Sequence, residues 1–144
     1  MMNVDVAAGR PPLVLIVDPS VSSRHFMWRA LSRALGVLEA GSADAARAWI
    51  TQRPDIDAIV VQDELPDQRG LDLVRDLHIE RRAVASRAIV LARPQLAGQG
   101  TSHGPTLLDR GDLPGVLRKL ASWFLVRDAE LARALSREAG RLAK

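Results

Sequence analysis

Leu13-Val-Leu-Ile-Val-Asp18 is the stretch that decides the fold, because five consecutive apolar residues end in a single carboxylate. A continuous apolar run of this length is typical of a strand that is buried on both faces of a parallel sheet. Open α/β sheets bind their ligands at the carboxyl ends of such strands. We therefore expect Asp18 at the edge of the sheet that carries the functional site.

Short apolar runs recur along the chain, and segments with helical spacing separate them. Strands are predicted over residues 37–40, 58–62, 88–92 and 106–109, and helices over 20–35, 42–53 and 71–82 and from 112 onward. Three glycines and two prolines between residues 93 and 105 predict a loop, so the fourth helix is expected to be short or lost. The alternation predicts a flavodoxin-like doubly wound parallel sheet, (βα)5, with strand order 2-1-3-4-5.

Composition limits the class of protein. A chain of 144 residues fits one domain, and no run approaches the ~18 apolar residues of a membrane span. The lack of cysteine excludes disulfides and cysteine metal sites and fits a cytoplasmic location. Three histidines without shared spacing predict no metal site, and no cofactor is expected. Residues 1–12 are expected to be a flexible leader and residues 13–126 the domain.

The C-terminal segment carries the whole charge imbalance, with seven Lys/Arg against four Asp/Glu from Asp112 onward. One helix from Asp112 to Lys144 would be about 45–50 Å long, so its end, residues 127–144, is predicted to protrude. Its apolar residues approximate a heptad seam. We expect this seam to form a homodimer or to dock a partner protein, with the homodimer favoured, and the alternative is a fold back onto the sheet where the fourth helix is missing. The seam residues are Leu117, Leu120, Phe124, Leu131, Leu135 and Leu142.

A basic stripe lies on the same predicted helix, where Arg133, Arg137 and Arg141 follow at intervals of four residues. Single-stranded nucleic acid usually needs aromatic side chains for base stacking, and none interleaves here. The stripe therefore indicates the solvated flank of a helix. A nucleic-acid-binding adaptor remains a lower-ranked alternative, and no membrane contact is expected.

Residues 14–18, 39–40 and 58–70 together resemble the receiver domain of bacterial two-component response regulators. The likeness runs over roughly residues 13–123 and includes Pro66 and Gly70 in the turn after the third strand. In that family two adjacent acids end the first strand. With an aspartate at the tip of the third strand, they bind Mg²⁺ and accept a phosphoryl group. A hydroxyl residue and a lysine, at the ends of the fourth and fifth strands, hold the phosphoryl oxygens.

The resemblance implies a degenerate phosphorylation pocket in this chain. Only the first acid is kept, and a neutral amide at the acceptor position can neither attack phosphorus nor offer Mg²⁺ an anionic oxygen. Glu64 is placed at the rim of the pocket. Arg110 is predicted to pair with Asp18 or with Glu64 in place of a metal. The five family positions hold Asp18, Pro19, Gln62, Ala92 and Arg110.

These replacements predict a pseudo-receiver, which is a non-enzymatic signalling module that works by contact with a kinase or regulator. The alternative is a divergent receiver that a histidine kinase phosphorylates on Asp63, if a bulge brings that residue to the strand tip. Otherwise Asp63 is expected to be a solvent-facing carboxylate of the turn. Ser22, His25 and Asp18 are too close in sequence to predict a catalytic triad.

Overall fold

Five parallel strands form one sheet in the computed structural model, which describes residues 11–93, 105–124 and 129–142. The spatial order β2-β1-β3-β4-β5 confirms the predicted fold class and strand order. Continuous apolar runs form these strands because helices cover both faces of the sheet. The strands are β1 (Leu13–Val17), β2 (Gly36–Ala40), β3 (Ala58–Gln62), β4 (Ala88–Ala92) and β5 (Thr106–Asp109).

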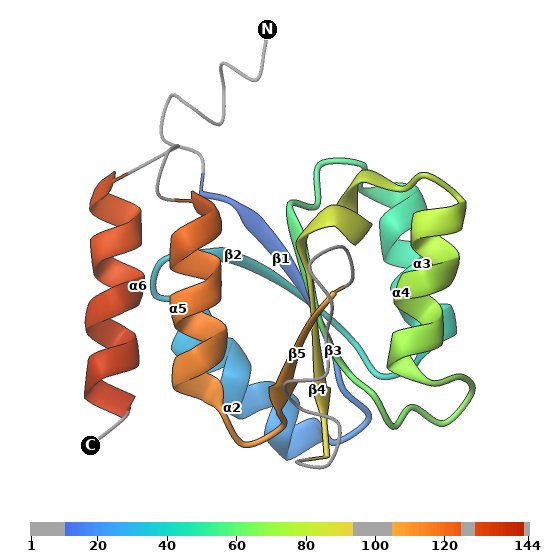
Figure 1. The fold of residues 1–144 in the computed structure, drawn as a ribbon, viewed down its shortest axis with the longest axis horizontal. Coiled ribbons are helices and arrows are strands. Elements are labelled where there is room, and N and C mark those ends of the chain that lie inside the picture. The colour runs from blue at the N-terminus through green and yellow to red at the C-terminus, as the bar shows by residue number, and fades with distance from the viewer. Residues whose placement is uncertain (1–10, 94–104, 125–128, 143–144) are drawn as a thin grey trace, which may run out of the picture.

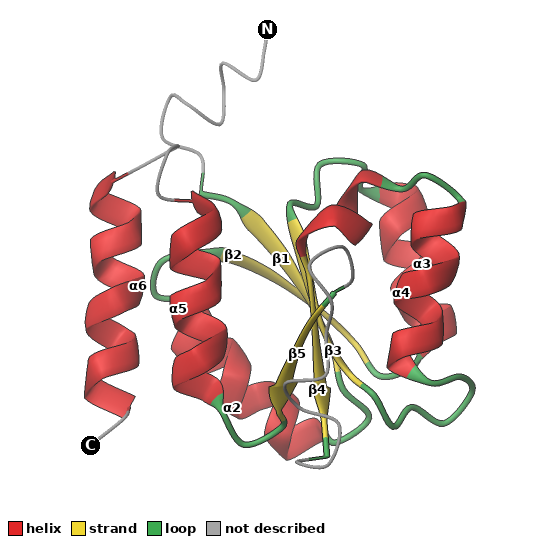
Figure 2. Ribbon diagram, viewed as in Figure 1, coloured by secondary structure: helices red, strands yellow, loops and turns green. Residues whose placement is uncertain are grey.

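Helices cover the sheet in two layers. Figure 1 shows α2, α5 and α6 on one side of the sheet and α3 and α4 on the other, and Figure 2 shows the strands between them. Side chains alternate along β1, so Val14 and Ile16 pack toward α2 and α5 whereas Leu15 and Val17 pack toward α3 and α4. The helices are α2 (Val21–Leu31), α3 (Ala43–Gln52), α4 (Gly70–Ile79), α5 (Leu113–Phe124) and α6 (Ala129–Leu142), with a 3-10 turn, η1 (Ala83–Arg87).

Serine caps begin two of the helices. The Ser20 hydroxyl accepts from the Ser23 amide (3.2 Å) and the Ser42 hydroxyl accepts from the Ala45 amide (3.1 Å), which satisfies N–H groups that lack an intrahelical partner. Helix α2 ends at Leu31, earlier than the predicted end at residue 35, because the chain has to turn before β2 begins at Gly36. Most of the loop predicted over 93–105, and with it the expected loss of a fourth helix, lies outside the described residues.

The prediction of one unbroken, protruding C-terminal helix is wrong. The C-terminus is helical, but α5 ends at Phe124 and α6 runs back along it (Figure 1). Leu135 and Ala139 are each 1% exposed, in the same core cluster as α2 and α5. Arg33, two residues after the end of α2, also pairs with Glu138 of α6 at 3.7 Å. The physical reason is that packing on α5 buries the apolar stripe of α6 within the same chain.

This arrangement removes the argument for a partner at residues 127–144. The seam residues that the structure describes in full are buried in their own chain, except that Leu142 is only partly buried. The alternative fold-back was expected at the missing fourth helix, whereas α6 packs on α5 and α2. The side chain of Leu131 lies outside the described part. Within the ranges described above, no helix is long and apolar enough to cross a membrane.

Replacing Leu135 by Ala should lower the free energy of unfolding by about 2–4 kcal/mol, because it leaves a cavity between α6, α5 and α2. Arg137→Ala, on the exposed side of the same helix, should change it little. Chemical denaturation of both variants tests this. Because Leu135 is buried within one chain, the unfolding midpoint should not depend on protein concentration. A midpoint that rises with concentration would place Leu135 between two chains instead.

Gly70 begins α4 where the backbone passes β3 closely. A Cβ at this position would lie 2.3 Å from the Gln62 carbonyl oxygen and 3.0 Å from the Asp63 Cα. Gly70→Ala should therefore destabilise the fold by about 1–3 kcal/mol. Gly140→Ala is the matched control, because nothing lies within 4 Å of that site and alanine should stabilise α6 by about 1 kcal/mol. Equal effects of the two substitutions in thermal unfolding would contradict the close approach.

Candidate functional site

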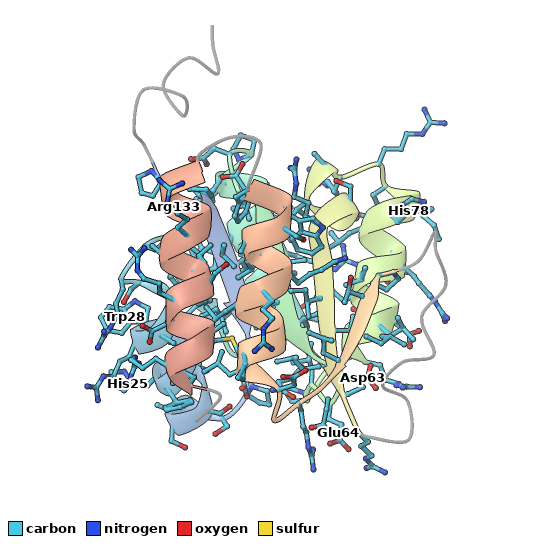
Figure 3. The ribbon with its side chains drawn as sticks, turned by 60° about the vertical axis from the view of Figure 1, so that its left-hand side comes forward. His25, Trp28, Asp63, Glu64, His78 and Arg133 are labelled. Carbon is cyan, nitrogen blue, oxygen red and sulfur yellow. The ribbon has the colours of Figure 1, made fainter. Side chains whose placement is uncertain are left out.

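The strand register brings the predicted pocket residues to one edge of the sheet. Val17 of β1 pairs with Val61 of β3, so Asp18 and Gln62 follow at the same level on neighbouring strands. On the other side, Ala92 of β4 pairs with Asp109 of β5, directly before Arg110. This is the carboxyl edge, where Figure 3 labels Asp63 and Glu64.

A cavity of about 530 Å³ opens at this edge, around the ends of β3, β4 and β5. Of the predicted set, Gln62, Asp63, Glu64, Ala92 and Arg110 line the cavity, whereas Asp18 and Pro19 do not. The sequence prediction missed the other four lining residues. Arg93 could have been found, because it directly follows the fourth strand. The nine lining residues are Gln62, Asp63, Glu64, Leu65, Arg69, Leu91, Ala92, Arg93 and Arg110.

Glu64 joins the tips of β4 and β5. Its Oε1 accepts from Arg110 Nη1 at 2.8 Å and its Oε2 accepts from Arg93 Nη2 at 2.5 Å. Both guanidinium groups lower the pKa of the Glu64 carboxyl below its ordinary value, and Arg93 has the larger effect. Of the two partners predicted for Arg110, the structure selects Glu64. Each carboxylate oxygen therefore serves a different guanidinium.

Asp18 is 3% exposed and lies apart from this cluster. Its Oδ1 accepts from the Ser20 amide at 2.9 Å, and its Oδ2 has no hydrogen-bond partner in the described part of the chain. Arg24 lies beside it, donating from Nη1 to the Asp18 carbonyl (2.7 Å) and from Nε to Glu39 (3.1 Å). Arg24 therefore links the backbone at the end of β1 to Glu39 of β2.

The residues at this edge do not fit a resident Mg²⁺ ion. Mg²⁺ prefers anionic oxygen ligands. Asp18 supplies one carboxylate, Pro19 supplies no side-chain oxygen, and the Gln62 amide is neutral. Across residues 11–93, 105–124 and 129–142, no three acidic or histidine side chains form a group that could hold a metal. The positive charge at the cavity comes from arginines.

Asp63 is not the solvent-facing residue that the sequence predicts, since it is only 6% exposed. Its Oδ2 accepts from Arg69 Nη2 (2.5 Å) and Nε (3.2 Å), and its Oδ1 accepts from the Leu71 amide (3.0 Å). The Leu71 amide lies in the first turn of α4, where N–H groups lack intrahelical partners. Asp63 therefore ties the end of β3 to the start of α4.

Asp67 fixes the loop between β3 and α4 to the neighbouring helix. Its two carboxylate oxygens accept from the Ala43 amide (2.9 Å) and the Asp44 amide (3.0 Å) at the N-terminus of α3. These backbone hydrogen bonds lower the pKa of Asp67. Nothing in the local sequence distinguishes this contact from an ordinary surface turn, so the prediction missed it. The cavity rim consequently rests on a loop held at both ends.

The histidines do not gather at the site. His25 lies on the exposed side of α2 and stacks on Trp28, with ring centroids 5.7 Å apart. His78 lies at the far end of α4, and Figure 3 shows both away from Asp63 and Glu64. His103 lies outside the described residues.

Comparison with known proteins identifies the fold through solved structures. No family model matches the sequence, and no curated protein matches it. A response regulator receiver protein from Pseudomonas putida is 24% identical with a TM-score of 0.67, and the match covers 79% of this chain and 98% of that chain. A chain of the CheX–CheY–BeF3–Mg²⁺ complex from Borrelia burgdorferi is 23% identical with a TM-score of 0.67, covering 85% and 95%.

A third similar structure is the signal receiver domain of an HD domain-containing protein from Pseudomonas fluorescens Pf-5. It is 21% identical with a TM-score of 0.68, and the match covers 82% of this chain and 98% of that chain. All three matches span nearly the whole length of the solved chains. The sheet order, the helix layers and these matches lead to one conclusion: this chain has the fold of a response regulator receiver domain.

Proposed function

We propose that the chain is a pseudo-receiver, which keeps the receiver fold but signals without accepting a phosphoryl group. The observation that carries the proposal is Gln62, a carboxamide at the tip of β3, level with Asp18 and lining the cavity. A neutral amide is a poor nucleophile and cannot form an acyl phosphate. The chain would then act in a two-component-like system without enzymatic activity of its own.

The surroundings of Gln62 support this proposal. Ala92 ends β4 with a methyl group, so it cannot donate a hydrogen bond to a phosphoryl oxygen. Arg110 stands where the resemblance places a lysine, but its guanidinium is held by Glu64. Three functions of the family's pocket, namely nucleophile, hydroxyl donor and metal binding, are therefore without a suitable side chain.

The alternative, phosphorylation of Asp63, requires a rearrangement. Successive strand residues point to opposite faces, and the Asp63 carboxylate bonds to Arg69 and to the Leu71 amide. To attack phosphorus, the Asp63 carboxylate would have to leave both of these partners. A buried carboxylate in a charge-assisted pair is costly to release. We therefore rank this alternative below the pseudo-receiver.

Partners would be other signalling proteins, as in the structure of CheY with CheX. Helix α2 offers a contact surface, because Val21 (69%), Phe26 (59%) and Trp28 (38%) are exposed large hydrophobic residues. A homodimer through the C-terminal helix is not part of the proposal, since that seam is largely buried within the chain. Nucleic-acid binding ranks last, because Arg141 of the basic stripe already pairs with Glu138.

Incubation with a small phosphodonor and Mg²⁺ should leave the mass of the intact protein unchanged, because neither Gln62 nor the paired Asp63 can act as the nucleophile. Intact-mass spectrometry measures this directly. The four-fold variant Pro19→Asp, Gln62→Asp, Ala92→Thr, Arg110→Lys should gain the mass of one phosphoryl group, since it restores the acids, the hydroxyl and the lysine.

The control pair for this experiment is Asp63→Asn and Asp67→Asn, two carboxylates of the same loop. If the unmodified chain gains a phosphoryl group that Asp63→Asn abolishes and Asp67→Asn retains, the pseudo-receiver proposal is wrong and Asp63 is the acceptor.

A further inference from the structure

The outward side of α2 is apolar and basic. Of the four large hydrophobic residues that are exposed in the described part of the chain, three lie on α2, namely Val21, Phe26 and Trp28. Trp28 stacks on His25, with ring centroids 5.7 Å apart. No aspartate or glutamate occurs between residues 19 and 38. A group of exposed apolar side chains on one helix is typical of a protein interaction surface.

The two helix layers differ in charge. Helices α2, α5 and α6 together carry seven Lys/Arg and two glutamates, a net charge of +5. Helices α3 and α4 carry two arginines and three aspartates, a net charge of −1. Figure 3 shows His25, Trp28 and Arg133 on the side of the molecule away from Asp63 and Glu64. The layer with the exposed aromatic residues is therefore also the basic layer.

Helices α2 and α6 meet at one carboxylate that two arginines share. Glu138 of α6 pairs with Arg141 of the same helix and, at 3.7 Å, with Arg33, two residues after the end of α2. Both guanidinium groups lower the pKa of the Glu138 carboxyl, and Arg141 has the larger effect. Because two cations share one carboxylate, this junction keeps a net charge of +1.

Two further arginines extend this junction, and neither forms an ion pair with another described residue. Arg29 lies four residues before Arg33, and Arg137 lies four residues before Arg141, so each helix carries a pair of guanidinium groups on one face. Such a pair is spaced by about 6 Å along the helix axis. Phe26 is 59% exposed and lies three residues before Arg29, on the same face of α2. We call these five residues the α2–α6 surface, which carries +3 after the charge of the shared glutamate is subtracted.

We propose that the α2–α6 surface binds an acidic amphipathic helix of a partner protein. Glutamates four residues apart on such a helix have the same spacing of about 6 Å as the paired arginines, so each can bond to one guanidinium. A neighbouring apolar side chain of the partner covers Phe26. Charge complementarity selects an acidic partner, and the apolar contact adds the affinity that exposed ion pairs alone do not supply. The inference rests on the proposed function, because it takes contact with signalling proteins as the activity and names the chemistry of the partner.

The test is the fluorescence anisotropy of a labelled synthetic peptide, with glutamates and leucines on adjacent faces of one helix, titrated with the full chain. A scrambled peptide of the same composition is the ligand control, and the chain should bind it more weakly. Phe26→Ser should weaken binding of the amphipathic peptide about tenfold, because it removes the apolar contact. Arg29→Gln and Arg137→Gln should each weaken it about threefold, because exposed ion pairs contribute less.

Ile79→Ser and Arg75→Gln are the matched controls, because both side chains are exposed on α4, in the other helix layer. Both variants should bind the amphipathic peptide like the unmodified chain. Every substituted side chain in the test and control variants is exposed, so thermal unfolding should stay close to that of the unmodified chain. A loss of binding is then not a loss of folding.

Three kinds of result would overturn the proposal. Equal affinity for the two peptides, or equal losses in the test and control variants, would mean non-specific attraction to a basic protein. Tighter binding of a single-stranded oligonucleotide with the same charge as the peptide would assign the surface to nucleic acid. A dimer of the chain alone that Phe26→Ser abolishes would assign it to a second copy.

The outcome is separable from that of the phosphorylation experiment. No phosphoryl donor is present in the binding assay, so a failure to bind the peptide leaves the pseudo-receiver proposal standing. A chain that binds the peptide and also gains a phosphoryl group would overturn the pseudo-receiver proposal and leave the α2–α6 surface standing.

Discussion

The parallel pairing of β1 with β3 is the constraint on which the candidate site depends. With Val17 opposite Val61, the residues that end these two strands, Asp18 and Gln62, must lie at the same level on the same edge. Strands β4 and β5 then add Ala92 and Arg110 beside them. The pairing rests on backbone hydrogen bonds and on apolar burial along the two strands, and neither depends on the side chains at the tips. The same scaffold can therefore carry different side chains at this edge.

The carboxylates of the cavity are neutralised by arginines of the same chain. Each carboxylate at the cavity has an arginine partner: Asp63 has Arg69, and Glu64 has Arg93 and Arg110. A divalent cation would otherwise be needed to keep several acids together at the end of a sheet. Here guanidinium groups from the same chain supply the positive charge, and the tip of β3 carries Gln62, a neutral amide. The two features are consistent, because each reduces the need for a metal.

Much of the fold could be predicted from the sequence because its signals are local. Continuous apolar runs identify buried strands, and serine caps mark the starts of helices. The alternation of strands and helices along the chain then predicts the order of the strands in the sheet. The environment of Asp63 could not be predicted, because its burial depends on Arg69 folding back across the turn. Asp67 likewise finds partners 23 and 24 residues away, at Asp44 and Ala43. The course of α6 was missed because no glycine or proline separates it from α5 in the sequence, and only its packing on α5 determines where it lies.

Helix α6 also has a consequence for how the molecule can be approached. It lies over α5 and against α2, so that layer of the sandwich is thickened by one additional helix (Figure 1). The surface of α5 that α6 covers is therefore closed to a helix of a partner protein unless α6 is displaced. A partner that leaves α6 in place must bind another surface, such as the outward side of α2 or the α3–α4 layer.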